Sequence, residues 1–242
     1  MIYTVGKIDV PALRGVDITV KEGEFVAVMG PSGCGKSTLA LSLMGYYFAP
    51  LHYSGGEIII DGRTISGMDP DEVRKSILGR EISYIPQAAM NALNPTRKII
   101  DFIADVVQAH DMHANKKEIY ERASGLFETL GLPVEVLQKY PVELSGGMKQ
   151  RLGLGAAILH RPKIVFLDEP TTGIDTLGAR IVRNMLKKLS QEEKRTIILT
   201  THDLNEVSEL CDRVGILNAG KLAAIGKPQE LEQKFKAANL ED

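Results

Sequence analysis

The sequence predicts an α/β protein built around a largely parallel sheet. Short β-rich apolar runs alternate along the chain with longer stretches of helical pattern, as in parallel sheets whose strands are joined by helices. The three clearest strands are residues 25–29, 164–167 and 196–200. The first ends in a glycine-rich loop, the second in two acids, and the third just before His202.

Other segments add an antiparallel component to this core. Residues 57–62 indicate a strand followed by a turn. Residues 214–217 and 221–225 flank Asn-Ala-Gly, which is a hairpin signal. The sequence therefore predicts a mostly parallel sheet with an antiparallel β subdomain, and a charged surface helix over residues 228–242.

A helical subdomain is predicted to interrupt the core. Residues 88–160 are mainly helical in pattern, with helices expected at residues 116–130 and 147–159. We expect the whole chain to form a single domain. In this interpretation residues 1–87 and 161–242 form the core with its β subdomain, and the helical subdomain is inserted between them.

Composition restricts the class of protein. A chain of 242 residues with 44% hydrophobic and 25% charged residues is long enough for one domain with a substantial core. The net charge of −2 argues against a general nucleic-acid-binding surface. Cys34 and Cys211 alone make neither a disulfide framework nor a thiolate metal site, which favours reduced, cytoplasmic thiols. No apolar stretch reaches the length of a membrane span, so a membrane role would require docking to other subunits.

The glycine-rich loop carries the strongest motif. It fits the pattern G-x-x-x-x-G-K-[ST] between a strand and a helix, and consists of Gly30, Pro31, Ser32, Gly33, Cys34, Gly35, Lys36, Ser37 and Thr38. Its glycines let successive backbone N–H groups point at phosphate oxygens, and the following helix adds its positive end. Lys36 is expected to reach the β- and γ-phosphates, and the Ser37 hydroxyl to bind Mg²⁺. The motif predicts a P-loop NTPase core that takes ATP and Mg²⁺.

The second strand ends in two acids with expected roles in catalysis. Asp168 is placed to hold Mg²⁺, directly or through water, and Glu169 to polarise a water for attack on the γ-phosphorus. A general base in this position contributes roughly 10²–10⁴ in rate. Acids that end a strand are also common as helix caps, and it is the pairing with the P-loop that favours the catalytic interpretation.

Residues 144–151, here called the signature segment, resemble the signature sequence of the ABC ATPases. Ser145, Gly146 and Gly147 are expected to form the start of a helix. That end can bind an anion, and the resemblance implies that the anion is the γ-phosphate of ATP held by a second subunit. A Ser cap with a glycine turn is the alternative, and the position just before the acidic strand favours the family resemblance.

Four further residues receive roles only through this resemblance. Gln87 is similar to the glutamine that contacts Mg²⁺ and the attacking water and links to the transmembrane partner. His202 resembles the switch histidine, which contacts the γ-phosphate and Glu169. Asp175 matches the D-loop that crosses to the opposite subunit. Tyr3 is the candidate for stacking on adenine, against the alternative of a core aromatic on an edge strand.

The resemblance implies that two such domains meet head to tail and trap two ATP molecules, each between one P-loop and the other domain's signature segment. Hydrolysis then separates them. Residues 173–174 are Gly-Ile where Ala-Leu or Ser-Leu is usual. Gly153 and Gly155 fall inside the signature helix and could each weaken it by up to ~1 kcal/mol, unless close packing against neighbouring backbone requires them.

Residues 88–96 narrow the subtype. They resemble a Met-x-x-Leu-Asn-Pro stretch of the ATPases of dipeptide, oligopeptide and nickel importers, and residues 140–148 agree with it. The alternative is that Asn94 and Pro95 only form a capping turn. No cysteine follows Cys211, so the chain resembles the shorter nickel-type members or a trimmed peptide-type one. The transported solute cannot be inferred from this chain.

The expected partners are a second ABC ATPase subunit, identical or paralogous, and two transmembrane permease subunits, with a solute-binding protein acting indirectly. No nucleic acid is expected, and the predicted location is peripheral, on the cytoplasmic face of the membrane. A soluble ABC ATPase acting on ribosomes or DNA is the alternative; such proteins generally carry two ATPase domains or long insertions. An unrelated P-loop kinase or GTPase is opposed by the signature segment and by His202.

Overall fold

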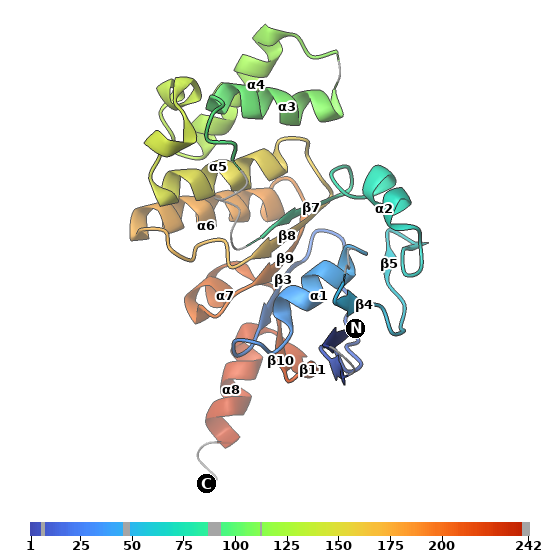
Figure 1. Cartoon of the computed structure of the whole chain (residues 1–242). Helices are drawn as coiled ribbons and strands as arrows, with labels where there is room; N and C mark the ends of the chain where they lie inside the picture. Colours follow the sequence, from blue (N-terminus) through green and yellow to red (C-terminus); the bar gives the residue numbers. More distant parts are fainter. Residues whose placement is uncertain (6–7, 46–48, 87–92, 112, 239–242) are drawn as a thin grey trace. The chain divides into compact units, whose positions relative to one another are not determined.

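The computed structural model of the chain describes residues 1–5, 8–45, 49–86, 93–111 and 113–238. They divide into two compact units, whose helices and strands carry labels in Figure 1. The first unit comprises Met1–Leu78 and Thr196–Asp242, and the second comprises Gly79–Arg195. Among the described residues, no helix combines the length and the apolar character that crossing a membrane requires.

The first unit contains strands in the order β11-β10-β3-β9. Their bounds are β3 Phe25–Met29, β9 Thr196–Thr200, β10 Arg213–Asn218 and β11 Lys221–Gly226. β3 is parallel to both β9 and β10, and all five residues of β9 are buried, as expected for a strand covered on both faces. The predicted hairpin is confirmed: β10 and β11 are antiparallel, and their turn places Ala219 at φ 46° and Gly220 at φ 77°.

Helices and small sheets complete the first unit. The helices are α1 Lys36–Leu43, α2 Pro70–Ser76, α7 Leu204–Leu210 and α8 Pro228–Ala238. An antiparallel sheet has the order β2-β1-β4, with β1 Ile2–Val5, β2 Ile8–Pro11 and β4 Leu51–His52, and β5 Ile59–Ile60 pairs with β6 Arg63–Thr64. The strand expected from residue 57 is therefore shorter than predicted. The core includes a cluster of four buried side chains: Ala27, Val207, Val214 and Leu231.

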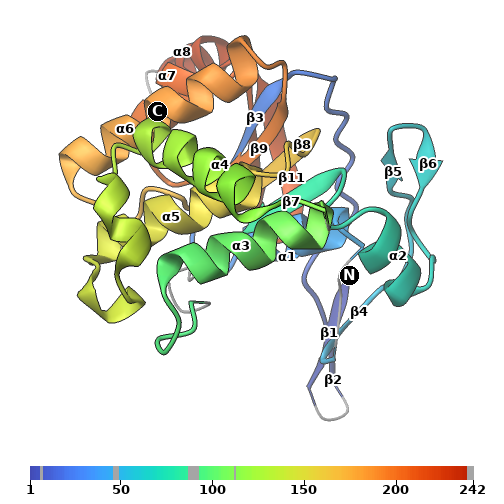
Figure 2. The ribbon, with the colours of Figure 1, turned by 90° about the horizontal axis from the view of Figure 1, so that it is seen from above.

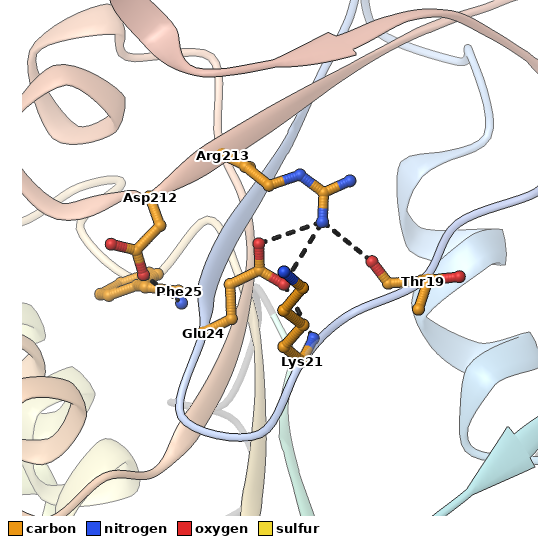
Figure 3. A network of polar contacts seen from close by, with 6 residues as sticks. All are labelled: Thr19, Lys21, Glu24, Phe25, Asp212 and Arg213. Atoms are coloured by element: carbon orange, nitrogen blue, oxygen red, sulfur yellow. Dashed lines mark hydrogen bonds and ion pairs between the residues drawn. The ribbon is translucent and has the colours of Figure 1, made fainter.

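A polar network fastens the amino ends of β3 and β10 (Figure 3). Arg213 Nη1 donates to both carboxylate oxygens of Glu24, at 3.0 and 3.3 Å, and to the carbonyl of Thr19 at 3.0 Å. The neighbouring Asp212 carboxylate accepts from the Phe25 amide at 2.9 Å. Because β3 leads directly into the glycine-rich loop, these contacts help to hold the strand that presents the loop.

The second unit combines two parallel strands with helices (Figures 1 and 2). The strands are β7 Ile82–Ile85 and β8 Ile164–Asp168. The helices are α3 Ile99–His110, α4 Lys116–Thr129, α5 Gly146–Ile158 and α6 Thr176–Gln191, with 3-10 turns at Val134–Gln138 and Pro141–Glu143. α3 packs on α4, and α5 packs on both β7 and α6.

Side-chain spacing explains these helices. On α6 the buried residues Val182, Met185, Leu186 and Leu189 recur at the spacing of a helix with one apolar face. On α5, a Cβ added to Gly155 would lie 2.5 Å from Leu130 Cδ1. Close packing thus favours glycine here, as the sequence suggested, although Gly155 packs against leucine side chains rather than backbone.

Two stacked histidines link β7, α3 and the end of α5 in the second unit. The rings of His110 and His160 have centroids 4.2 Å apart, and His160 Nε2 lies 3.0 Å from Ser83 Oγ. Burial, reinforced by the positive charges of His110 and Arg195, lowers the pKa of His160 to about 4. Burial and the charge of Arg80 also lower the pKa of His110.

Candidate nucleotide-binding and catalytic site

The glycine-rich loop, residues 30–38, contains three positions whose backbone favours glycine. Gly30, Gly33 and Gly35 have φ angles of 154°, 77° and 108°. A Cβ on Gly30 would lie 2.1 Å from the carbonyl oxygen of Leu217, so a side chain has no room there. Around Gly33 nothing lies within 4 Å of an added Cβ, so only its backbone angle requires glycine. The loop conformation therefore depends on backbone angles that glycine adopts freely. Such a conformation lets the backbone amides bind phosphate.

Lys36 and Ser37 open helix α1 directly after this loop. Lys36 is buried, with an exposed fraction of 8%, and its Nζ donates to the carbonyls of Gly30 at 2.7 Å and Pro31 at 3.2 Å. Ser37 is exposed in the first turn of α1. A positive charge, a hydroxyl and a helix amino end thus lie beside the loop, and this combination attracts a phosphate.

Tyr3 lies beside the same helix. Its hydroxyl is 3.3 Å from Thr38 Oγ1, and its side chain is half-buried. The alternative placed Tyr3 on an edge strand. That placement is wrong, because β1 is the central strand of the sheet β2-β1-β4. Stacking of Tyr3 on adenine stays a prediction.

His202 follows β9 in the first unit. Thr200 at the end of β9 is in register with Val28 of β3, so His202 and the glycine-rich loop leave the parallel sheet at the same edge. The turn is held from beneath by a buried hydrogen bond of 2.6 Å from Thr201 Oγ1 to Glu206 Oε2. The His202 side chain is exposed. Its position suits contact with a ligand bound at this edge.

Asp168 ends strand β8 in the second unit and is buried, with an exposed fraction of 5%. The hydroxyl of Tyr84 on β7 donates to Asp168 Oδ2 at 3.4 Å. Burial of the phenol, together with this carboxylate, raises the pKa of Tyr84 and keeps it protonated as the donor. The contact orients one carboxylate oxygen of Asp168.

Glu169 has an unusual backbone. Its φ of 48° lies in the left-handed region, which costs a residue other than glycine about 1–3 kcal/mol and recurs at functional sites. Its carboxylate accepts from Thr172 Oγ1 at 3.2 Å, and its carbonyl accepts from the Thr172 amide at 3.2 Å. We call residues 168–172 the acidic turn. Such strain persists only where the surrounding contacts hold it.

The signature segment opens helix α5 in the same unit. Ser145 caps the helix, and its Oγ accepts from the Met148 amide at 3.3 Å. A Cβ on Gly147 would lie 3.4 Å from Asp175 Oδ1, and Asp175 itself caps α6 by accepting from the Gly178 amide at 3.3 Å. The structure therefore brings Asp175 against Gly147 of the signature segment. Both helix starts present partial positive charge.

Three residues of the second unit were not assigned roles by the sequence: Tyr84, Gln150 and Thr172. Gln150 lies within the signature segment, where its Nε2 donates to the carbonyl of Pro170 in the acidic turn at 2.7 Å. The sequence contained one usable signal, a polar residue on the same helix as the buried Leu152 and Leu154. Tyr84 and Thr172 gave none, because their partners depend on tertiary contacts.

The predicted site residues thus form two groups. The first unit carries Tyr3, the glycine-rich loop and His202, whereas the second carries the acidic turn, the signature segment and Asp175. Gln87 and residues 88–92 lie outside the described residues. Among the residues that are described, no cluster of three or more His, Cys, Asp or Glu could hold a metal ion by itself.

Comparison with known proteins extends these observations. Residues 13–172 match the family described as ABC transporter. The chain is 35% identical over 222 residues to the dipeptide transport ATP-binding protein DppD of Caldanaerobacter subterraneus subsp. tengcongensis, covering 91% of this chain and 68% of the relative. It is 34% identical to the oligopeptide transport ATP-binding protein OppD of Bacillus subtilis, covering 92% of this chain and 63% of that protein.

A solved structure gives the corresponding similarity in three dimensions. It is the dimeric, post-hydrolysis state of an ATP-binding cassette bound to ADP and phosphate. The TM-score is 0.83 at 29% sequence identity, covering 94% of this chain and 95% of that one. The similarity confirms the predicted fold class, an α/β core with a mostly parallel sheet and added helices.

Proposed function

We propose, since the chain belongs to the ABC transporter family, that it is the ATP-binding and ATP-hydrolysing subunit of an importer for a small solute. The observation that carries the proposal is Glu169, a carboxylate held at φ 48° directly after the buried Asp168. Strain at one acidic residue is retained where a function needs it. Both relatives named above are transport proteins, and neither favours the alternative of a ribosome- or DNA-associated ATPase.

In the proposed reaction the amides of the glycine-rich loop bind the phosphates of ATP, and Lys36 balances their charge. Glu169 accepts a proton from water while the water oxygen attacks the γ-phosphorus and ADP leaves as the other product. His202 contacts the γ-phosphate, and Gln87 positions the attacking water. Tyr3 stacks on adenine. These roles are proposals that follow the motif order of the family.

Magnesium fits the oxygen ligands that the proposed site offers. Asp168 contributes a carboxylate and Ser37 a hydroxyl, and Mg²⁺ prefers such ligands together with phosphate oxygens and water. When bound, the ion neutralises charge that develops on the phosphates. Neither cysteine is needed as a ligand, in keeping with the preference of Mg²⁺ for oxygen.

The proposed site is completed by a second ABC ATPase subunit, identical or paralogous. Ser145, Gly146 and Gly147 of one subunit bind the γ-phosphate of ATP on the glycine-rich loop of the other, and Asp175 crosses the interface. The dimeric cassette with 29% identity supports this arrangement. Phosphates bridge the interface, so ATP should favour the dimer by mass action.

Glu169→Gln tests both chemistry and assembly. The amide cannot accept the proton from water, so hydrolysis should fall by roughly 10²–10⁴ while ATP binding persists. Light scattering with Mg-ATP should then detect a stable dimer, alone or with its paralogous partner, and monomers without nucleotide. Lys36→Ala should instead weaken nucleotide binding and abolish the dimer. A dimer that ignores ATP, or near-normal turnover by Glu169→Gln, would refute the proposal.

The permease is proposed to dock beside Asn94. A pocket of about 190 Å³ is lined there by Leu93, Asn94, Arg97, Phe102, Asp105 and Pro141. The Asn94 side chain accepts from the amide and hydroxyl of Thr96, at 3.0 and 2.8 Å, and so forms a local turn, although not the capping turn of the alternative. The N-cap residue of α3 is Lys98, so Asn94 does not cap that helix. A structural and a docking role are compatible at this position.

Asn94→Ala should reduce co-purification with the permease subunits and spare ATP binding by the isolated chain. Asn115→Ala is the matched control, since Asn115 likewise accepts two hydrogen bonds, from the amides of Lys117 and Glu118, and does not line the pocket. Loss of ATP binding by folded Asn94→Ala, or equal loss of assembly in the control, would contradict docking.

The solute class and location follow from the same assignment. Peptides are the proposed cargo, with nickel as the alternative within the importer group, since both relatives named above are dipeptide or oligopeptide transport ATP-binding proteins. The subunit is proposed to act at the cytoplasmic face of the membrane beside two permeases and, indirectly, a solute-binding protein. The subdomain boundaries at residues 88 and 160 also stay a proposal. Co-purification with permeases, followed by vesicle uptake of labelled dipeptide or Ni²⁺, distinguishes the cargoes.

A further inference from the structure

Gln150 is a buried polar residue on the helix that carries the signature segment. Its exposed fraction is 4%, and its Nε2 donates to the carbonyl oxygen of Pro170 at 2.7 Å. Its other amide atom, Oε1, is also buried, but has no hydrogen-bond partner among the residues that the structure describes. An unpaired buried acceptor destabilises a fold, so folding stability alone does not account for this amide.

The acceptor of this hydrogen bond lies next to the strained residue of the acidic turn. Pro170 directly follows Glu169, whose φ is 48°. Proline has no backbone N–H, so the turn cannot be anchored through a donor at this position. The donation by Gln150 fixes the carbonyl instead. It is therefore one of the contacts that hold the backbone of the acidic turn directly after Glu169.

The helix carries Gln150 together with the proposed phosphate-binding end. α5 begins at Gly146, and Gln150 lies about one helical turn further along. The Arg151 guanidinium reinforces the same turn by donating to the carbonyl of Gly147 at 3.3 Å. Because the hydrogen-bonded turns of a helix move together, a displacement of its amino end also displaces the Gln150 amide.

We propose that Gln150 is a positioning residue that couples the signature segment of each subunit to the acidic turn of the same subunit. Binding of the other subunit's γ-phosphate at Ser145, Gly146 and Gly147 sets the position of α5, and Gln150 passes that position to Glu169. The general base of one ATP site is then aligned when the second ATP site is occupied. The inference rests on the proposed function, since it needs a dimer with two ATP sites.

Gln150→Met tests the coupling, because methionine fills a similar volume and cannot donate to Pro170. In the dimer, with its paralogous partner where one is required, we expect kcat to fall about tenfold, the equivalent of one lost positioning contact. ATP binding to the isolated chain and ATP-dependent dimerisation should be kept. We expect the Hill coefficient for ATP to exceed unity in the parent and to fall to unity in this variant.

Arg151→Met is the matched control on the same helix. It removes hydrogen bonds to the carbonyls of Gly147, Leu130 and Gly131, at 3.3, 3.0 and 3.1 Å, and no contact to the acidic turn. We expect it to lower Tm and to keep the Hill coefficient of the parent. A merely structural role of Gln150 would give the same result for both variants.

The outcomes separate the inference from the proposed function. A Gln150→Met enzyme with the kcat and Hill coefficient of the parent overturns the coupling, as does a parent whose Hill coefficient is already unity. A loss of kcat matched by equal losses of ATP binding and Tm also overturns it. If Gln150→Met does not fold, Gln150→Leu gives the same comparison with a shorter apolar side chain that also cannot donate. A parent that hydrolyses no ATP with any partner overturns the proposed function and the inference together.

Discussion

The glycine-rich loop and the acidic turn both place left-handed backbone at a proposed ATP site, but they do so with different residues. Gly30, Gly33 and Gly35 adopt positive φ without a steric penalty. Glu169 adopts φ 48° with a full side chain, next to a proline. The loop needs only its amides, so glycine suffices there. The turn needs a carboxylate, and its backbone must be held by neighbours such as Thr172 and Gln150.

The difference teaches where each region is sensitive to substitution. In the loop the backbone itself is the binding surface, so adding an atom should be damaging and removing a neighbour should matter little. In the acidic turn the strained conformation is held by contacts with neighbouring residues, so removing one of these neighbours should reduce the rate of catalysis. Replacing the strained residue by glycine should even stabilise the fold.

The largest effect is expected for Gly30→Ala. The added Cβ would lie 2.1 Å from the carbonyl of Leu217, and a backbone atom cannot move aside cheaply. We expect the free energy of unfolding to fall by about 3 kcal/mol or more. Gly33→Ala, with nothing within 4 Å of its Cβ, should lose only about 1 kcal/mol through its φ of 77°. Urea denaturation of both variants provides the comparison, and equal losses would show that contact with Leu217 is unimportant.

Acid should destabilise the unit that holds the acidic turn. The pKa of folded His160 is lowered to about 4 from an ordinary value of 6.5. Between these values the unfolded chain binds a proton that the folded chain does not, so stability falls as pH falls from 6.5 towards 4. Because the ring is only partly buried, we expect a loss of about 1–2 kcal/mol.

His160→Gln removes this titration and should flatten the dependence of unfolding free energy on pH over the same range. His52→Gln, in the first unit, serves as the matched control and should keep the acid sensitivity of the parent. Urea denaturation at a series of pH values makes the measurement. If the unfolding free energy of His160→Gln depended on pH as strongly as that of the parent, His160 would not be the cause of the acid sensitivity.

Local pattern was enough to predict the strands at residues 25–29 and 196–200 and the hairpin near Gly220, because the spacing of apolar residues and the turn residues are local properties. The need for glycine at residue 30 was not predictable in detail, since the obstructing carbonyl belongs to Leu217, far along the chain. The strain at Glu169 and its contact with Thr172 likewise depend on tertiary packing. The sequence therefore predicted these strands and this turn better than the tertiary contacts that hold the candidate site residues in place.

Glu169→Gly and Glu169→Ala compare strain directly. Both remove the carboxylate, and we expect neither to hydrolyse ATP at an appreciable rate. The glycine variant should be more stable than the alanine variant by about 1 kcal/mol, because only alanine keeps the penalty of a left-handed backbone. Chemical denaturation without nucleotide measures the difference. An alanine variant as stable as the glycine variant would mean that φ 48° carries no strain here.

The smallest effect is expected at Thr172, whose hydroxyl donates to Glu169 Oε2 at 3.2 Å. Thr172→Val keeps the shape and loses the donor, so the carboxylate should be less well oriented and kcat should fall about two- to fivefold. Thr172→Ser keeps the hydroxyl and should stay close to the parent. KM for ATP should change in neither variant, because the contact is made to the base and not to the nucleotide. Steady-state ATPase assays of the dimer measure the difference. An equal kcat in the valine and serine variants would show that the Thr172 hydroxyl does not orient Glu169.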